Sequence, residues 1–220
     1  MPGVKKSTPT ILNLPSSEIC VGTNIGLLGG SFNPAHEGHL EISLLALEKL
    51  RLDYIWWMVS PQNPLKPKKG MASLSERLST ARRTADDPRI SVTDVETELG
   101  TLYTVDTLLA LRNHFSETRF VWLMGADNLL EMHRWQKWSK IFYTVPVAVF
   151  ARPNYSLPAE KAEATKRFAR FRMPDLEAHH LAGKRPPAWV FFKRPSNPIS
   201  ATKIRSYDKD DQAKKIFKRS

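Results

Sequence analysis

Short apolar runs alternate with segments of helical periodicity along most of the chain. Runs of strand length lie at 25–28, 54–59, 90–95, 120–124, 145–150 and 189–192. Apolar residues recur every three or four positions at 40–50, 105–115 and 158–170, and the segment 73–84 opens with Ser73 and Glu76 at capping-box spacing. We predict a strand for each run and a helix for each of these four segments, with an irregular connection over 171–187.

Strands separated by helices pair in parallel through right-handed crossovers, because a tight turn cannot join parallel strands. The pattern therefore predicts an α/β fold with one sheet covered on both faces. We expect one domain over 24–206, a flexible N-terminal extension over 1–23 and a basic tail over 207–220. In such sheets, ligands bind at the carboxyl ends of the strands.

The composition is that of an ordinary globular protein, with 220 residues of which 41% are hydrophobic and 25% charged. No apolar run approaches the roughly 18 residues of a membrane-spanning helix, and the first residues lack the apolar core of a secretory signal. The one cysteine, Cys20, excludes an internal disulfide and a multi-cysteine metal site. We expect a cytoplasmic protein without a membrane partner.

Positive charge is concentrated towards the C-terminus. The net charge is +11, and residues 151–220 hold 17 Lys and Arg against 7 Asp and Glu. Nucleic acid, anionic lipid and a phosphorylated small molecule are all attracted by such an excess, and composition does not choose among them.

The segment after the first predicted strand reads GGSFNPAHEGH over 29–39. Gly29 and Gly30 let the backbone approach a ligand, and the helix that follows presents free amides to an anion. His36 and His39 are three residues apart, so in one helical turn they share a face and can both donate to a phosphate. The spacing fits neither GxGxxG nor a Walker A loop, and His36 to His39 is one residue short of the zinc motif HExxH.

A second candidate anion site lies at ISATKIR, residues 199–205. Ser200 or Thr202 can cap a short helix, and Arg205 offers a planar guanidinium for bidentate phosphate binding. A Ser or Thr cap followed by basic residues is also common at ordinary helix starts, so this segment alone is a weak indication.

Together, the two segments resemble the nucleotidylyltransferase superfamily, with its GGxFxPxHxGH and ISxTxxR patterns. NPLK at 63–66, YTVDTL at 103–108, and GADNL at 125–129 with Trp135 resemble segments of the nicotinate-mononucleotide adenylyltransferases. Leu65 and Asn154 depart from the family pattern, as does the segment after Arg205.

The resemblance implies a Rossmann-like, doubly wound, mostly parallel sheet with a small C-terminal helical part. It implies transfer of AMP from ATP to nicotinate mononucleotide, with Mg²⁺ entering alongside ATP and no dedicated protein ligands for the metal. His36, His39 and Arg205 would be catalytic. The residues at ATP would be Gly29, Gly30, Ser31, Phe32, His36, His39, Asp127, Ser200, Thr202 and Arg205, and those at the mononucleotide would be Asn33, Lys66, Tyr103, Thr104 and Trp135.

Several of these roles have a competing structural interpretation. Trp135 and Trp138 have the spacing of a core-facing helical stripe, and Asp127 is placed to cap the next helix. Lys66 has Lys68 and Lys69 close by, and any of the three is explained equally well as surface charge.

Two other functions remain open. The chain is also compatible with an adenylyltransferase for nicotinamide mononucleotide or for another phosphorylated acceptor. A nucleic-acid-binding module using the basic C-terminal third is a more distant alternative, because such a module needs no second phosphate clamp. The sequence is compatible with a homo-oligomer.

Overall fold

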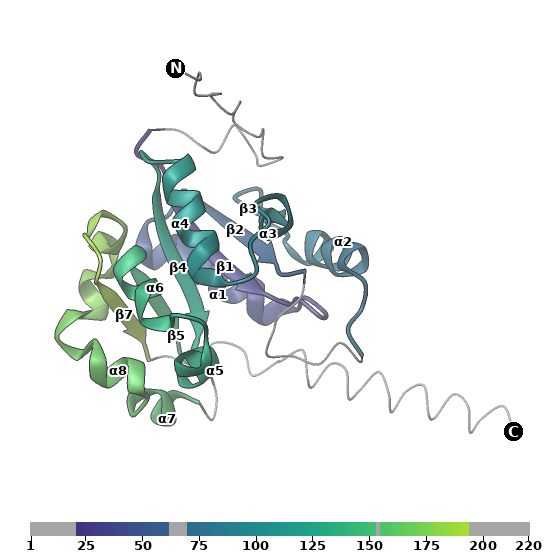
Figure 1. The fold of residues 1–220 in the computed structure, drawn as a ribbon. Coiled ribbons are helices and arrows are strands. Elements are labelled where there is room, and N and C mark those ends of the chain that lie inside the picture. Colours follow the sequence, from purple (N-terminus) through teal and green to yellow (C-terminus); the bar gives the residue numbers. More distant parts are fainter. Residues whose placement is uncertain (1–20, 62–69, 153–154, 194–220) are drawn as a thin grey trace, which may run out of the picture.

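The computed structural model describes residues 21–61, 70–152 and 155–193, and in this part of the chain seven parallel strands form one sheet (Figure 1). Along the chain the strands are β1 Asn24–Gly30, β2 Tyr54–Val59, β3 Ile90–Thr93, β4 Arg119–Gly125, β5 Val147–Phe150, β6 Arg172–Met173 and β7 Trp189–Phe192. Their order in the sheet is β3-β2-β1-β4-β5-β7-β6. The predicted α/β sheet is confirmed, and every described strand pair is parallel.

The helices connect these strands. They are α1 Glu37–Leu50, α2 Leu74–Thr84, α3 Val95–Glu98, α4 Thr104–His114, α5 Ala126–Glu131, α6 Trp138–Thr144, α7 Ser156–Glu160 and α8 Glu163–Arg167, with 3-10 turns η2 Met132–Arg134, η3 Ala169–Phe171 and η4 Asp175–Gly183. The predicted capping box of α2 is present, because Glu76 N donates to Ser73 Oγ and Ser73 N donates to Glu76 Oε2.

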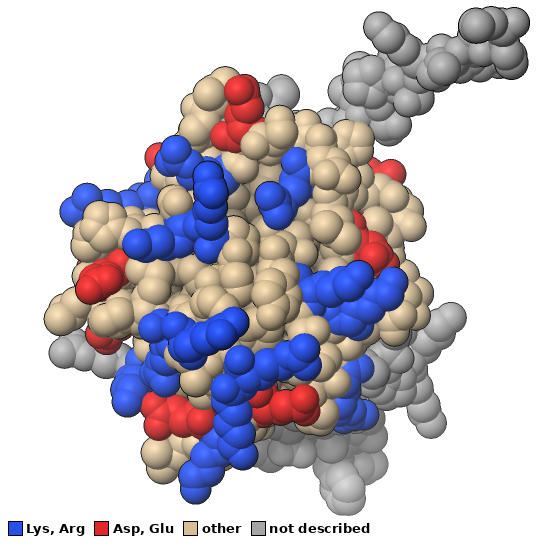
Figure 2. Space-filling model, turned by 60° about the vertical axis from the view of Figure 1, so that its left-hand side comes forward, with Lys and Arg blue, Asp and Glu red and all other residues tan. Residues whose placement is uncertain are grey.

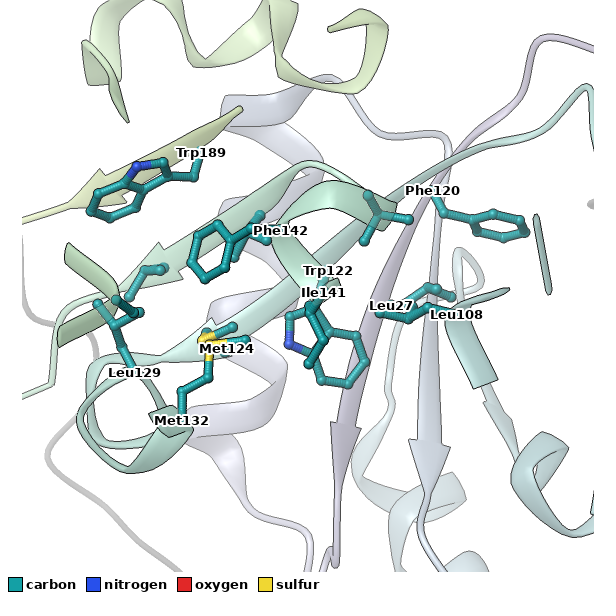
Figure 3. Close-up of a cluster of buried hydrophobic side chains, with 14 of the residues drawn as sticks. Leu27, Leu108, Phe120, Trp122, Met124, Leu129, Met132, Ile141, Phe142 and Trp189 are labelled. Carbon is teal, nitrogen blue, oxygen red and sulfur yellow. The ribbon is translucent and has the colours of Figure 1, made fainter. Parts of the chain in front are cut away.

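Alternating residues along each strand build a separate core on each face of the sheet. On β2, Trp56 and Met58 belong to one core, whereas Ile55, Trp57 and Val59 belong to the other. The first core, drawn in Figure 3, contains residues from α4, α5 and α6 around Trp122, and the second contains residues of α1 and η4. The expectation of a sheet covered on both faces is confirmed.

The C-terminal part differs from the sequence prediction in two places. The helix expected over 158–170 is divided into α7, α8 and η3, because Ala162 is extended and Thr165 Oγ1 donates to Ala159 O at 2.7 Å across the break. The connection expected to be irregular over 171–187 contains β6 and η4. Trp189 Nε1 donates to Phe168 O at 2.8 Å and so fastens this part to β7.

The order in which the chain adds strands to the sheet reverses between β1 and β4. The chain places β2 and β3 on one side of β1 and then begins β4 on the other side, and it is at such a switch point that α/β sheets leave a crevice for a ligand. The indole of Trp122 on β4 lies against Gly29 of β1, where a Cβ would overlap it. Gly29 is therefore required by the packing of the strands themselves, in addition to any ligand that approaches the backbone.

We expect Gly29→Ala to lower the free energy of unfolding by about 1–3 kcal/mol, because the added methyl group must displace the buried Trp122 ring. Gly30→Ala is the matched control, since its Cβ would lie 3.4 Å from the Phe32 ring, an ordinary contact. Urea unfolding of both variants measures the difference. Equal destabilisation by the two substitutions would show that Trp122 does not impose the glycine.

Candidate active site

The loop from β1 to α1 is held by the packing of Phe32. Phe32 has a positive φ of 44° and is only 1% exposed, with its ring 5.2 Å from Trp57 and 4.7 Å from His39. Its side chain is therefore part of the core, and the predicted contact with ATP would have to be made by its backbone. The buried ring fixes the path of the loop that leads to the two histidines.

His36 and His39 lie side by side at the start of α1, as the spacing predicts. His36 is the N-cap, His39 is the third helical residue, and their ring centroids are 3.9 Å apart. The backbone N–H of His36 donates to Nδ1 of His39 at 3.2 Å. Since an acceptor nitrogen has no proton, the proton of the neutral His39 ring is on Nε2, which is therefore the donor nitrogen of the ring.

Two further side chains fix the first turn of α1 to the sheet. Ser43 Oγ donates to the carbonyl of His39 at 2.8 Å, and Trp57 Nε1 donates to Ser43 Oγ at 2.8 Å. Both side chains are fully buried, so these hydrogen bonds are shielded from water. The histidine pair thus projects from a rigid platform.

His36 lies in the electrostatic field of an ion pair between two other loops. Arg152, directly after β5 and Ala151, donates from Nη1 to Asp127 Oδ2 at 3.4 Å. Burial, followed by the positive charge of Arg152, lowers the pKa of His36 to about 4, against a smaller opposing effect of Asp127. The loop after β1, the start of α5 and the end of β5 therefore meet, and His36 is neutral at pH 7.

The site contains buried polar atoms that lack partners. Among the described residues, neither His36 Nδ1 nor Asp127 Oδ1 has a hydrogen-bond partner. Burying such atoms without a partner is costly, and in a native protein they often mark a ligand site. Asp127 is the second residue of α5, whose N-cap is Gly125, so the competing capping role for Asp127 is wrong.

Four of the residues predicted at the mononucleotide are described, and they lie in or next to loops: Asn33, Tyr103, Thr104 and Trp135. Tyr103 is the N-cap of α4 and Thr104 its first residue, as predicted for a turn opening a helix. Asn33 holds a neighbouring loop, since Nδ2 donates to Gly70 O and Oδ1 accepts from Ala72 N, both at 3.1 Å. Its contact with the mononucleotide stays a prediction.

The two tryptophans after α5 differ in their surroundings. The ring of Trp138 has Phe168 edge-on at 6.1 Å and the guanidinium of Arg167 at 5.4 Å. Trp135 is half-buried against the same core but has no ring or cation contact with the described residues. Trp138 therefore makes ring and cation contacts with its described neighbours, and the role of Trp135 at a ligand stays a prediction.

The remaining predicted residues, Lys66, Ser200, Thr202 and Arg205, lie outside the described residues, as do most of the N-terminal extension and the whole basic tail. Sequence reasoning missed Arg152 as a site residue. The signals for it were its position just past a predicted strand and its place, with Pro153, in the family pattern from which Asn154 departs.

No group of three or more His, Cys, Asp or Glu side chains within the described ranges is arranged to hold a metal ion. No helix in this part of the chain is long and apolar enough to cross a bilayer.

The positive charge of the C-terminal part lies on one flank of the molecule. The described residues 155–193 hold eight Lys and Arg against four Asp and Glu. Figure 2, which brings forward the side with β7 and α8, shows more Lys and Arg than Asp and Glu on this face. Arg170 lies 4.5 Å from the Phe171 ring, and Arg172 lies 5.3 Å from both Trp189 and Phe191.

Residues 27–207 match the cytidylyltransferase-like family. The chain belongs to this family. The resemblance carried by the two phosphate motifs is thereby confirmed.

The relatives of this cytidylyltransferase-like chain include proteins named probable nicotinate-nucleotide adenylyltransferase. The one from Bradyrhizobium sp. (strain BTAi1) is 50% identical over 184 residues, covering 84% of this chain and 96% of the relative. The one from Cereibacter sphaeroides (strain ATCC 17025) is 52% identical over 182 residues, covering 83% and 96%. The Plasmodium falciparum nicotinic acid mononucleotide adenylyltransferase complexed with NaAD has the same fold, with a TM-score of 0.63 at 16% identity over 84% of this chain and 83% of that one.

We expect His36 to make the folded chain less stable in acid. Its pKa of about 4 in the folded state is below the ordinary value of 6.5, so the unfolded chain binds the proton first as the pH falls. The resulting stabilisation, at most about 3 kcal/mol, is complete above pH 6.5 and is lost as the pH falls through 4. Urea unfolding of wild type and His36→Gln at several pH values between 7 and 4 measures it.

In His36→Gln this part of the pH dependence disappears, so the wild type loses more stability than the variant on acidification. Parallel curves for the two proteins would contradict the assignment. Titration of the His36 ring protons by NMR checks the pKa directly.

Proposed function

We propose that this chain transfers the AMP group of ATP to the phosphate of nicotinate mononucleotide, giving deamido-NAD and pyrophosphate in NAD biosynthesis. The observation that carries the proposal is the pair of imidazoles beside the Gly29–Gly30 turn at the switch point of the sheet. The names of the relatives at about 50% identity agree with it.

The reaction needs positioning and charge neutralisation more than proton abstraction. The phosphate of a mononucleotide is already an anionic nucleophile, which attacks the α-phosphorus of ATP while the bond to the pyrophosphate breaks. The enzyme must therefore supply donors to the transferring phosphoryl group and to the leaving pyrophosphate. His39 Nε2–H, the amides at the start of α1 and Arg152 are donors of this kind at the described edge.

His36 would change its protonation state with the ligand. Nearby negative charge favours the charged form of an imidazole, so the phosphates of ATP would raise the lowered pKa of His36. Ring Nδ1, which is unpartnered among the described residues, would then be able to donate to a phosphate oxygen. On the other side, Asp127 Oδ1 would accept from a ribose hydroxyl.

The mononucleotide would lie across the neighbouring loops. Trp135, which is half-buried against the core, would stack its indole on the pyridine ring. The backbone amides of Tyr103 and Thr104, at the start of α4, would donate to the carboxylate of the ligand. Lys66 and Asn33 remain the candidates for its phosphate. Strand β7 ends on this edge at Phe192, and Ser200, Thr202 and Arg205, which follow it in sequence, are our candidates for the β- and γ-phosphates of ATP.

We assign Mg²⁺ to ATP itself. Asp127, the carboxylate beside His36, is paired with Arg152, and the described residues do not form a resident metal site. The ion would be carried by the triphosphate, whose charge it partly neutralises, and we derive no step through a protein-bound metal. A cytoplasmic location and homo-oligomer formation remain predictions.

We expect the purified chain to release pyrophosphate from ATP and Mg²⁺ when nicotinate mononucleotide is added, with a higher kcat/KM than with nicotinamide mononucleotide. A coupled pyrophosphate assay with both acceptors measures this. Equal or better use of the amide would move the chain to the alternative substrate. Salt-dependent DNA binding without any pyrophosphate release would favour the nucleic-acid function instead.

In the same assay, His39→Ala should reduce kcat by about 10²- to 10³-fold, the usual cost of removing one preorganised donor to a developing charge. Circular dichroism checks that the variant is folded. Wild-type turnover in the folded variant would refute the role of His39.

Trp135→Ala should raise KM for nicotinate mononucleotide by about tenfold, because it removes a stacking interaction of roughly 1–1.5 kcal/mol, and should leave KM for ATP unchanged. Trp135→Phe should keep most of the affinity. The control is Trp138→Ala, which loses contacts with Phe168 and Arg167 and should lower thermal stability without this selective change in KM. The reverse pattern would assign the ligand to Trp138.

A further inference from the structure

Arg77 lies beside the phosphate loop but belongs to none of the motifs. It is on α2 and is only 3% exposed. Its guanidinium makes four hydrogen bonds to backbone carbonyls: Nη1 donates to Ser31 O at 2.8 Å and Ser60 O at 2.7 Å, Nη2 to Pro61 O at 3.0 Å, and Nε to Ala72 O at 3.1 Å.

These four carbonyls come from three separate segments. Ser31 is in the turn after β1, Ser60 and Pro61 follow β2, and Ala72 precedes the N-cap of α2. The planar guanidinium, with its five fixed N–H directions, is the side chain that can join three such segments at once. A lysine carries the same charge on one nitrogen and cannot reproduce this geometry.

Within the described ranges, the charge of Arg77 has no acidic partner. None of the ion pairs among the described residues includes it, and burial lowers its pKa although it remains protonated at neutral pH. Burying a cation against carbonyl dipoles alone costs more than burying an apolar side chain of similar size. Stability by itself therefore gives little reason for an arginine at this position.

The end of β2 is also held from another direction. The hydroxyl of Ser60 is hydrogen-bonded to Glu96, a carboxylate that is only 6% exposed and whose pKa is raised by burial. Asn33 adds an independent contact to Gly70 and Ala72. Ser60 N donates to Gly30 O at 2.9 Å, which joins the two strands just before the turn. Arg77 adds the connection from the Ser31 carbonyl to the Ser60 carbonyl through one nitrogen atom.

We infer that Arg77 is a positioning residue that sets the spacing between the turn after β1 and the described ends of the β2–α2 connection, at Ser60–Pro61 and Ala72. Asn33, which we propose lies at the mononucleotide, is also hydrogen-bonded to Ala72. The inference rests on the proposed function. Each segment would still bind its own substrate without Arg77, but the acceptor phosphate would no longer lie in line with the α-phosphorus. A misplacement of about 1 Å costs about 10²-fold in rate.

The test compares Arg77→Lys and Arg77→Ala with Arg82→Ala, an exposed arginine on the same helix. We expect both Arg77 variants to lose about 10²-fold in kcat, with each KM changed by less than about threefold, whereas Arg82→Ala keeps wild-type kinetics. Millimolar guanidinium should restore part of the kcat of Arg77→Ala and leave Arg82→Ala unchanged. A merely structural arginine would lower the melting temperature without this split between kcat and KM.

Folded Arg77 variants with wild-type kcat would overturn the inference, and so would a loss confined to KM. If the wild-type chain itself releases no pyrophosphate, the proposed function fails, and hydrogen exchange then decides about Arg77. Faster amide exchange in Arg77→Lys both after β1 and after β2, compared with Arg82→Ala, supports the connection of the two segments. Unchanged exchange in either segment refutes it.

Discussion

Parallel pairing of β1 with both β2 and β4 is the constraint on which the rest of the molecule depends. Since all the described strands run in the same direction, their carboxyl ends share one edge, and the loops that follow them meet there. Residues far apart in sequence, such as His36 and Arg152, become neighbours through this geometry alone. The close approach of β1 and β4 requires Gly29, because Trp122 takes the space of its side chain.

This edge gathers charged and polar groups that are buried or partly buried, some of whose atoms lack a partner among the described residues. His36 is held neutral. Arg152 pairs with Asp127, and its positive charge also lowers the pKa of His36. The guanidinium of Arg77 is surrounded by carbonyl oxygens. Elsewhere the two cores are almost entirely apolar. These buried polar and charged groups are tolerated because the side chains below them, including Ser43 and Trp57, have their hydrogen-bond partners. A triphosphate ligand would supply the missing negative charge.

The sequence predicts the strands and most helices of this fold well, and it predicts the contacts of the charged residues at the site poorly. Strands such as 54–59 and 189–192 are found at their predicted bounds because continuous apolar runs of this length fit a sheet buried on both faces. The division of 158–170 was missed because alanines face the core on both sides of the break and keep the helical period. Arg77 and Arg152 were missed because three of the four partners of Arg77 are 16–46 positions away and the partner of Arg152 is 25 positions away, and no local pattern records contacts at that separation. Trp135 and Trp138 have the same chemistry and differ only in which neighbours cover them.

Strand β7, which pairs with β5 in the sheet, is synthesised long after β5. Residues 151–188 separate these paired strands, and every residue of β5 is buried in the finished structure. The ribosome adds about 5–20 residues per second, so for several seconds β5 is an apolar edge strand with unpaired amides and carbonyls. During this time the apolar edge of β5 is open to pairing with other chains, and a chain that ends before Trp189 would keep that edge exposed.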